Sequence, residues 1–356
     1  MKPLYAAFVG MRRDPSSLPA DYFSTFVRFH LELPWYYANN ENVRVHLTTT
    51  EPVDYREDFR PAGKGTISTL TEDQFMDPFY KEQHHPYDVV VHWRKWFDEL
   101  YVPGARNVIL TQDHSFSEKW KSDVKNAYES GKLEGILVFP TWHRENTAKE
   151  LSGMVPLNRL YAGMTLGVDT DIYRPHIKNP YSLLWASDPG RGLDNLIHPF
   201  LKLWSMNRKF TLTVAYPDYV KPEAVARFSH FLKHPGVRHM QGGVKNGPRL
   251  WDLFNESGIL PYSSTFPEPS SRCHRQAMAA GCMVLYPPNM GTPSHLIENG
   301  LTGIVEIPEM WPEIINSAVS SGRWEELGNN ARSFAISENW AVQANRFYSF
   351  FSKAES

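Results

Sequence analysis

The sequence has little of several features that would single out a class of protein. It contains only two cysteines, Cys273 and Cys282, among 356 residues, which excludes a disulfide framework and favours reduced, partly buried thiols. No apolar run reaches the roughly 18 residues of a membrane-spanning helix. The first residues lead directly into an apolar strand, without the charged region and cleavage site of a secretory leader. We therefore expect a soluble, cytoplasmic protein.

Blocks of one charge sign are also missing. The chain has 37 Lys and Arg against 39 Asp and Glu, a net charge of −2, with both signs interspersed. A nucleic-acid groove or an anionic membrane surface is thus not indicated, although composition alone does not exclude a nucleic-acid partner. Repeats and low-complexity tracts are absent as well. What is present, 42% hydrophobic residues in a chain longer than a typical domain, predicts two globular domains with ample cores.

Apolar runs alternate with helical periodicity along most of the chain, which predicts parallel sheets with crossover helices. In the first half, strands are expected at 4–10, 43–48, 87–91, 106–111, 133–140 and 160–163, and helices at 19–37, 118–129 and 142–151. Residues 51–86 are polar, aromatic-rich and without period. They predict a long irregular insertion, with at most one short helix, that serves either as a binding loop or as a surface elaboration.

The second half repeats the alternation. Strands are expected at 182–185, 210–216, 237–241, 259–261 and 283–286, and helices at 193–206, 222–231, 247–257, 311–319, 324–337 and 339–351. The most informative stretch is 258–305. Its strand at 259–261 leads into a loop of small residues that ends at Glu268, and a helix follows with Ser270 or Ser271 as N-cap and Gly281 as its stop. The loop thus places a carboxylate at the C-terminal edge of the strand. In open α/β sheets this edge, beside a helix N-terminus, is where anionic ligands bind.

This stretch resembles the donor site of retaining nucleotide-sugar glycosyltransferases of the GT-B architecture, family-4-like and also described as glycosyl transferases group 1. Their signature places a Glu after a strand and a second Glu eight positions later, before Ala-x-Ala-Gly. Glu268 occupies the first place, and Gln276 occupies the second, before the sequence AMAAG. The resemblance implies that Glu268 contacts the transferred sugar and that the residue at 276 binds the ribose, where an amide can still accept one hydrogen bond. The alternative is a Glu that only complements the helix dipole.

The resemblance extends to the diphosphate loop. The residues SDPGRGL at 187–193 match the SxPxRGL variant of the family, with Ser187 and Arg191 in place. A guanidinium there can grip two phosphate oxygens. Many relatives carry a second cation five positions earlier, where this chain has Ala186. We hypothesise that Arg272, next to Ser271 in the first turn of the helix, supplies replacement charge.

In the first half the resemblance is weaker. Asp113 and His114 follow a predicted strand and resemble a His-Asp pair of the family in inverted order. Either side chain could hold the donor sugar or handle the proton of the acceptor. Arg94 resembles a Trp-Arg that ends the preceding strand, with either a substrate-binding or a loop-bridging role. Gly10 ends the first strand and would let the backbone approach the sugar-phosphate. His143 is expected to be an ordinary residue on a helix face.

Residues 165–175, TLGVDTDIYRP, resemble the interdomain crossover of the family. The predicted fold is therefore α/β of the GT-B type, with two Rossmann-like, doubly wound domains facing a central cleft. The expected parts are an acceptor-binding domain at 1–176, a nucleotide-sugar-binding domain at 177–338, and a C-terminal helix at 339–356 that crosses back to the first domain. The resemblance is specific from about residue 165 to residue 305 and faint before residue 87.

The function implied is retaining, metal-independent transfer of a sugar from a nucleotide-diphosphate sugar, a UDP-sugar first among them, to a hydroxyl of a glycan or another acceptor. No cofactor is expected, because Arg side chains and helix dipoles would replace a cation. Related activities on the same fold would be a sugar-phosphate synthase or a nucleotide-sugar hydrolase. The alternatives of another kind are a non-catalytic nucleotide-sugar or glycan-binding module and a glycosyltransferase acting on hydroxymethylated DNA bases.

Overall fold

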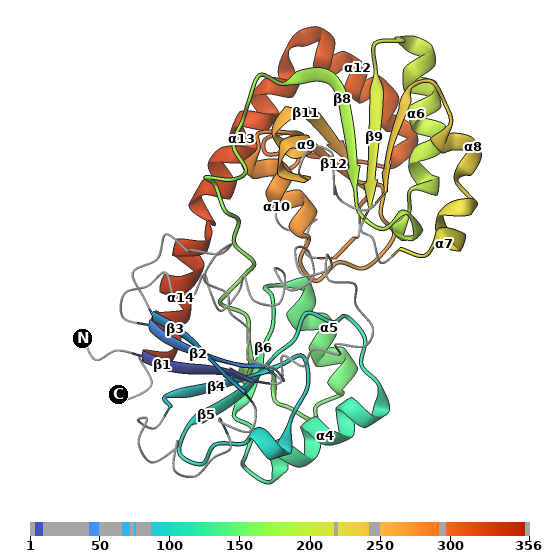
Figure 1. Ribbon diagram of the computed structural model, residues 1–356. Helices are drawn as coiled ribbons and strands as arrows, with labels where there is room; N and C mark the ends of the chain where they lie inside the picture. The colour runs from blue at the N-terminus through green and yellow to red at the C-terminus, as the bar shows by residue number, and fades with distance from the viewer. Residues whose placement is uncertain are drawn as a thin grey trace. The chain divides into compact units, whose positions relative to one another are not determined.

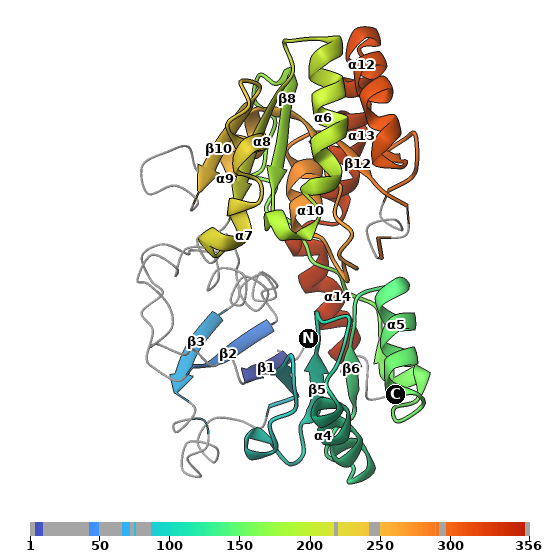
Figure 2. The ribbon, with the colours of Figure 1, turned by 90° about the vertical axis from the view of Figure 1, so that its right-hand side faces the viewer.

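The computed structural model describes residues 4–9, 43–49, 66–71, 75, 87–216, 220–241, 250–288, 290–291 and 297–352. The chain forms two compact units (Figures 1 and 2). One unit joins Met1–Leu166 to Trp340–Ser356, and the other is Gly167–Asn339. The divisions expected from the sequence fall after residues 176 and 338.

The first unit is built on a seven-stranded, fully parallel sheet in the order β3-β2-β1-β4-β5-β6-β7. Its strands are β1 (Leu4–Val9), β2 (Val43–Thr49), β3 (Thr66–Thr71), β4 (Val89–Trp93), β5 (Arg106–Leu110), β6 (Gly135–Leu137) and β7 (Leu160–Tyr161). The expectation that residues 51–86 are irregular is wrong at β3. This strand reads TISTLT, and its polar residues hide the strand pattern because it is an edge strand.

Helices cover both faces of this sheet. Successive residues of a strand point to opposite faces, and both faces carry apolar side chains that must be buried. Val108 and Leu110 of β5 pack with α14 (Trp340–Ser352), whereas Ile109 packs with α4 (Glu118–Glu129) and α5 (Trp142–Leu151). Figure 1 shows α14 on one side of the strands and α4 and α5 on the other. The last helix of the chain is thus part of the first unit.

The second unit has a six-stranded parallel sheet in the order β10-β9-β8-β11-β12-β13. Its strands are β8 (Asn179–Ala186), β9 (Thr211–Tyr216), β10 (Val237–Gln241), β11 (Ser257–Pro261), β12 (Met283–Tyr286) and β13 (Ile304–Val305). The predicted strand at 283–286 is confirmed at β12. In both sheets the strand order reverses direction near the centre, which defines a doubly wound fold.

The helices of the second unit are α6 (Asp194–Met206), α7 (Pro222–Ala226), α8 (Ser229–Leu232), α9 (Leu250–Glu256), α10 (Arg272–Ala279), α12 (Trp311–Ser321) and α13 (Arg323–Ser337). The single helix expected at 222–231 is wrong: it breaks into α7 and α8 at Phe228, where ψ is 0°. Short 3-10 turns add η2 (Asp98–Leu100), η3 (Leu157–Arg159), η4 (Pro189–Arg191) and η5 (Pro308–Met310).

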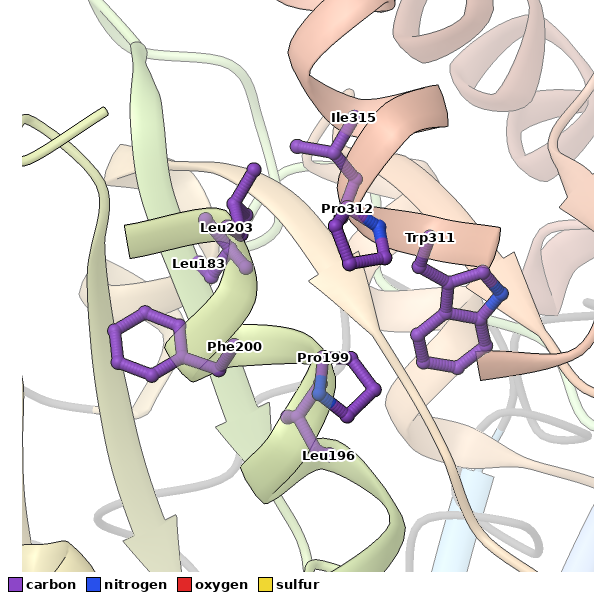
Figure 3. A pocket seen from close by; sticks show the side chains of 8 residues that line it. All are labelled: Leu183, Leu196, Pro199, Phe200, Leu203, Trp311, Pro312 and Ile315. Carbon is purple, nitrogen blue, oxygen red and sulfur yellow. The ribbon is translucent and has the colours of Figure 1, made fainter. Parts of the chain in front are cut away.

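The packing of α6 against α12 leaves a small apolar gap that has no room for a water molecule (Figure 3). It is lined by Leu183, Leu196, Pro199, Phe200, Leu203, Trp311, Pro312 and Ile315. Because these side chains are apolar and the space is too small for water, this gap belongs to the core. Within the ranges described, no helix combines the length and apolar character needed to cross a membrane.

Candidate functional site

The candidate site of the second unit lies where its strand order reverses. β8 and β11 are hydrogen-bonded neighbours, although β9 and β10 come between them in the sequence. Their following loops therefore emerge side by side at the carboxyl edge, which is where ligands bind in open parallel sheets. The loop after β8 carries Arg191, and the loop after β11 carries Glu268.

Three hydrogen bonds to backbone carbonyls hold these two loops together. The N–H of Thr265 donates to the carbonyl of Arg191 at 3.1 Å. The hydroxyl of Ser263 donates to the carbonyl of Gly192 at 2.7 Å, and the amide of Asn195 donates to the carbonyl of Ser263 at 3.2 Å. Since these bonds fix the backbone on both sides, the side chains of the two loops are positioned in advance of any ligand.

Gly192 is the residue that allows the loops to approach so closely. Its φ is +120°, and a Cβ atom at this position would lie 2.6 Å from the carbonyl oxygen of Ser263. Any other residue would be strained and would also push the two loops apart. The close approach of the two loops thus explains why a glycine follows Arg191, which the sequence alone does not.

The predicted convergence of Arg191 and Glu268 is confirmed. Nη1 of Arg191 lies 3.2 Å from Oε1 of Glu268, and the guanidinium also lies over the ring of Phe266, 4.4 Å from its centroid. The carboxylate is the buried partner: 8% of the Glu268 side chain is exposed, against 38% of the Arg191 side chain. The guanidinium is therefore the more exposed member of the pair.

Tyr262 is a site residue that the sequence did not reveal. Its hydroxyl donates to Oε1 of Glu268 at 3.0 Å. Since that donation uses its one proton, the hydroxyl of Ser187 must donate to Tyr262 across 3.2 Å. Tyr262 is 1% exposed and stacks on Trp185, with ring centroids 5.3 Å apart. Ser187, one of the predicted donor-binding residues, therefore reaches Glu268 through a phenol.

Burial sets the charge state of this network. It raises the pKa of Glu268, and the neighbouring Arg191 and the hydrogen bond from Tyr262 oppose that rise. Burial also raises the pKa of Tyr262 well above its ordinary value, and the charge of Glu268 adds to the rise. The phenol thus stays protonated and remains a donor to the carboxylate.

The helix α10 begins directly after this loop. Ser271 is at its N-cap position, as predicted, but its hydroxyl bonds to Nδ1 of His274 at 2.7 Å in place of a backbone N–H. Arg272 is the first residue of the helix. One turn further, Nε2 of Gln276 donates to the hydroxyl of Tyr173 at 2.8 Å. This bond leaves the carbonyl end of the Gln276 amide as its acceptor.

In the first unit, Arg94 and Asp113 form an ion pair between the ends of β4 and β5. Nε of Arg94 donates to Oδ2 of Asp113 at 3.0 Å, and Nη2 contacts Oδ1. Arg94 has a φ of +62°, and the indole of Trp120 donates to its carbonyl at 2.7 Å. The structure thus brings two of the predicted first-domain residues into direct contact.

The expectation that His143 is an ordinary helix-face residue is wrong. It is fully buried, accepts a hydrogen bond from the N–H of Phe139 at Nδ1 (3.0 Å), and lies 2.9 Å from the carbonyl of Asp113 through Nε2. Burial lowers the pKa of His143 to about 4, although the bond to Asp113 opposes this. The imidazole is therefore neutral, with its proton on Nε2.

Three further expectations concern Gly10, the two cysteines and a metal site. Gly10 lies outside the described residues. Cys273 and Cys282 are both free and buried. In the described part of the chain, no group of three or more His, Cys, Asp or Glu side chains is arranged to hold a metal ion.

Two parallel, doubly wound α/β units are the architecture of GT-B glycosyltransferases, and the comparison with solved structures shows this fold. The chain is similar to a glycosyltransferase from Rickettsia africae ESF-5, with a TM-score of 0.71, 12% identity and full coverage of both chains. It is also similar to Anabaena HepE in complex with UDP and glucose, with a TM-score of 0.66, 14% identity, and coverage of 98% of this chain and 99% of the other.

A third similar structure is sucrose-phosphate synthase from Thermosynechococcus elongatus, with a TM-score of 0.68, 13% identity and 99% coverage of both chains. Among curated proteins, spore coat protein SA of Bacillus subtilis (strain 168) is 34% identical over 115 residues. That match covers 31% of this chain and 29% of the relative. No protein-family model matches the chain.

Proposed function

We propose that this protein is a glycosyltransferase that moves a sugar from a nucleotide-diphosphate sugar to a hydroxyl of a glycan or another acceptor, with retention of anomeric configuration. The observation that carries the proposal is the 3.2 Å contact between Arg191 and Glu268 at the strand-order reversal of the second sheet. A cation and a carboxylate at one rigid edge suit the two ends of an activated sugar, whose diphosphate is anionic and whose anomeric carbon becomes cationic during transfer.

The proposed roles follow from charge and position. Arg191 grips the diphosphate, and Arg272 with the N-terminal N–H groups of α10 adds positive potential as the leaving group gains charge. Glu268 holds the sugar and stabilises the developing positive charge, and Gln276 accepts a hydrogen bond from the ribose. In the first unit, Asp113 and His114 act on the acceptor hydroxyl, one of them receiving its proton as the new C–O bond forms.

UDP is the favoured nucleotide. HepE, which shares the fold over nearly its whole length, has been crystallised with UDP, with UDP-glucose, and with UDP and glucose. The proposal requires no resident cofactor, because the cations that neutralise the diphosphate come from the chain itself. The cleft between two domains, the retaining stereochemistry and the identity of the acceptor stay predictions.

A panel of UDP-, GDP-, ADP- and dTDP-sugars tests the proposal by thermal shift and by release of nucleoside diphosphate. We expect one nucleotide class to raise the melting temperature, by an amount equivalent to about 2.7 kcal/mol at one hundred times its Kd. Release of the matching nucleoside diphosphate should follow and be lost in Glu268→Ala. A shift without turnover over any acceptor would favour the binding module, for which Gln276 and Ala186 argue. No shift with any nucleotide sugar would refute both.

A further inference from the structure

We propose that His143 is a positioning residue that holds Asp113 at the carboxyl edge of the first sheet, so that this carboxylate meets the acceptor in one fixed orientation. The part that concerns the acceptor rests on the function proposed above. The geometric part, that a neutral imidazole fixes Asp113, stands independently of it.

Asp113 is held from three neighbouring strand ends. Its carboxylate pairs with Arg94 at the end of β4, with 3.0 Å between Nε and Oδ2. Its N–H donates to the hydroxyl of Thr111, one residue after β5, at 3.2 Å. Its carbonyl lies 2.9 Å from Nε2 of His143, in the first turn of the helix that follows β6. The contact with His143 is the one that ties Asp113 to α5.

The tautomer of His143 is determined by its two contacts. The N–H of Phe139 can only donate, so Nδ1 of His143 must be the acceptor, and Nε2 then carries the proton that goes to the carbonyl of Asp113. Both ring nitrogens are satisfied within a fully buried side chain. A buried polar group with both its bonds made is rigid, because breaking either bond would leave a donor or an acceptor without water.

The same helix holds the next residue as well. The amide of Asn146 donates to the carbonyl of His114 at 2.6 Å. His143 and Asn146 are three residues apart and so lie on one face of α5. The helix thus presents two donors to two successive carbonyls, and it fixes the backbone of the Asp113-His114 pair as a unit.

The test uses two amide variants that separate the contacts of His143. An Asn side chain reaches the place of Nδ1, so His143→Asn keeps the bond with Phe139 and loses the bond with Asp113. A Gln side chain reaches the place of Nε2, so His143→Gln keeps the donor to Asp113 and loses the bond with Phe139. Each variant loses one neutral hydrogen bond, which makes them matched controls for stability.

The first readout needs no activity. In nitrogen-15 NMR spectra the Nε–H of Arg94, assigned with Arg94→Lys, reports the ion pair with Asp113. We expect this signal to be protected from exchange in the wild type and in His143→Gln, and to be lost in His143→Asn. The wild-type imidazole should show the Nε2–H tautomer. An Nδ1–H tautomer in the wild type would overturn the inference even if one variant failed to fold. An Arg94 signal that survives equally in two folded variants would overturn it as well.

The second readout is kinetic. With an acceptor in hand, His143→Asn should lower kcat/KM for that acceptor by between tenfold and about a hundredfold, as expected for a misplaced reacting group, and leave the KM for the donor unchanged. His143→Gln should stay within about threefold of the wild type. Equal losses in both variants would mean that His143 only packs. Absence of transfer in the wild type would instead refute the proposed function, and the NMR measurement would then decide the role of His143 by itself.

Discussion

Replacing Tyr262 by Phe would remove one oxygen atom from the core of the candidate donor site. The aromatic ring, with its stacking on Trp185, would remain, because Phe has the same shape. What is lost is the 3.0 Å hydrogen bond to Oε1 of Glu268. Glu268 and Tyr262 are 6% and 1% exposed, so water cannot readily replace the missing donor.

The size of the expected loss follows from the charge of Glu268, which accepts this hydrogen bond. A hydrogen bond to a charged group contributes about 1.5–3 kcal/mol, which corresponds to a loss in activity of between about tenfold and a hundredfold if Glu268 acts as a carboxylate. Because the bond from Tyr262 opposes the rise in the pKa of Glu268, its removal raises that pKa further. The acidic limb of the kcat/KM profile should therefore move to higher pH in Tyr262→Phe.

The pH dependence of stability tests the same bond. The bond stabilises the ionised form of Glu268, so its contribution is present at pH 8 and is lost as the pH falls through the raised pKa of Glu268. Urea unfolding of the wild type and Tyr262→Phe at pH 8 and at pH 4.5 measures this. The difference in unfolding free energy should be larger at pH 8. An equal difference at both pH values, together with an unmoved activity profile, would refute the role of the phenol.

Four further outcomes test other parts of the structure. Gly192→Ala, at φ +120° and against a backbone carbonyl, should cost about 1–3 kcal/mol of unfolding free energy by urea titration and should weaken donor binding. Glu268→Gln should abolish transfer but raise the unfolding free energy at pH 8, because the raised pKa of Glu268 means that the fold disfavours the ionised form. A lower melting temperature at pH 8 would contradict this. His92 and His143 have pKa values lowered to about 4, so each should lower the unfolding free energy by about 3 kcal/mol as the pH falls from 6.5 to 4. In His143→Gln only the loss caused by His92 should remain. Gln276→Glu should lower the donor KM by about fivefold, measured by initial rates, because a charged acceptor binds a ribose hydroxyl more strongly than an amide does.

Local signals in the sequence were sufficient for much of the fold. The helix predicted at 118–129 is α4 with the same limits, and Ser117 caps it by accepting from the N–H of Trp120. The helix predicted at 142–151 is α5, again with the same limits. For α4 the period of the helix and the residue at its N-cap agree. The strand β3 was missed because an edge strand needs no apolar run, so its residues resemble those of a polar loop.

Some residues of the candidate site could likewise be predicted from the sequence, and others could not. Arg191 and Glu268 were predictable because each follows an apolar strand and matches a motif of the family that the sequence resembles. Tyr262 could not be recognised, since an aromatic residue after a strand is usually core, and only the bond to Glu268 distinguishes it. His143 lies in a helix with few apolar residues, so the sequence does not reveal which face meets the sheet.

The two units have the same arrangement of side chains at the carboxyl edges of their sheets. In each, an arginine from one strand end pairs with a carboxylate from the neighbouring strand: Arg94 with Asp113 and Arg191 with Glu268. In each, a buried neutral side chain also holds the acidic member, with an imidazole at the backbone of Asp113 and a phenol at the carboxylate of Glu268. A neutral donor can orient an acid without bringing another charge into the core, which would have to be desolvated in turn. The arginine is the more exposed member of both pairs, so the cation meets solvent while the acid keeps its orientation.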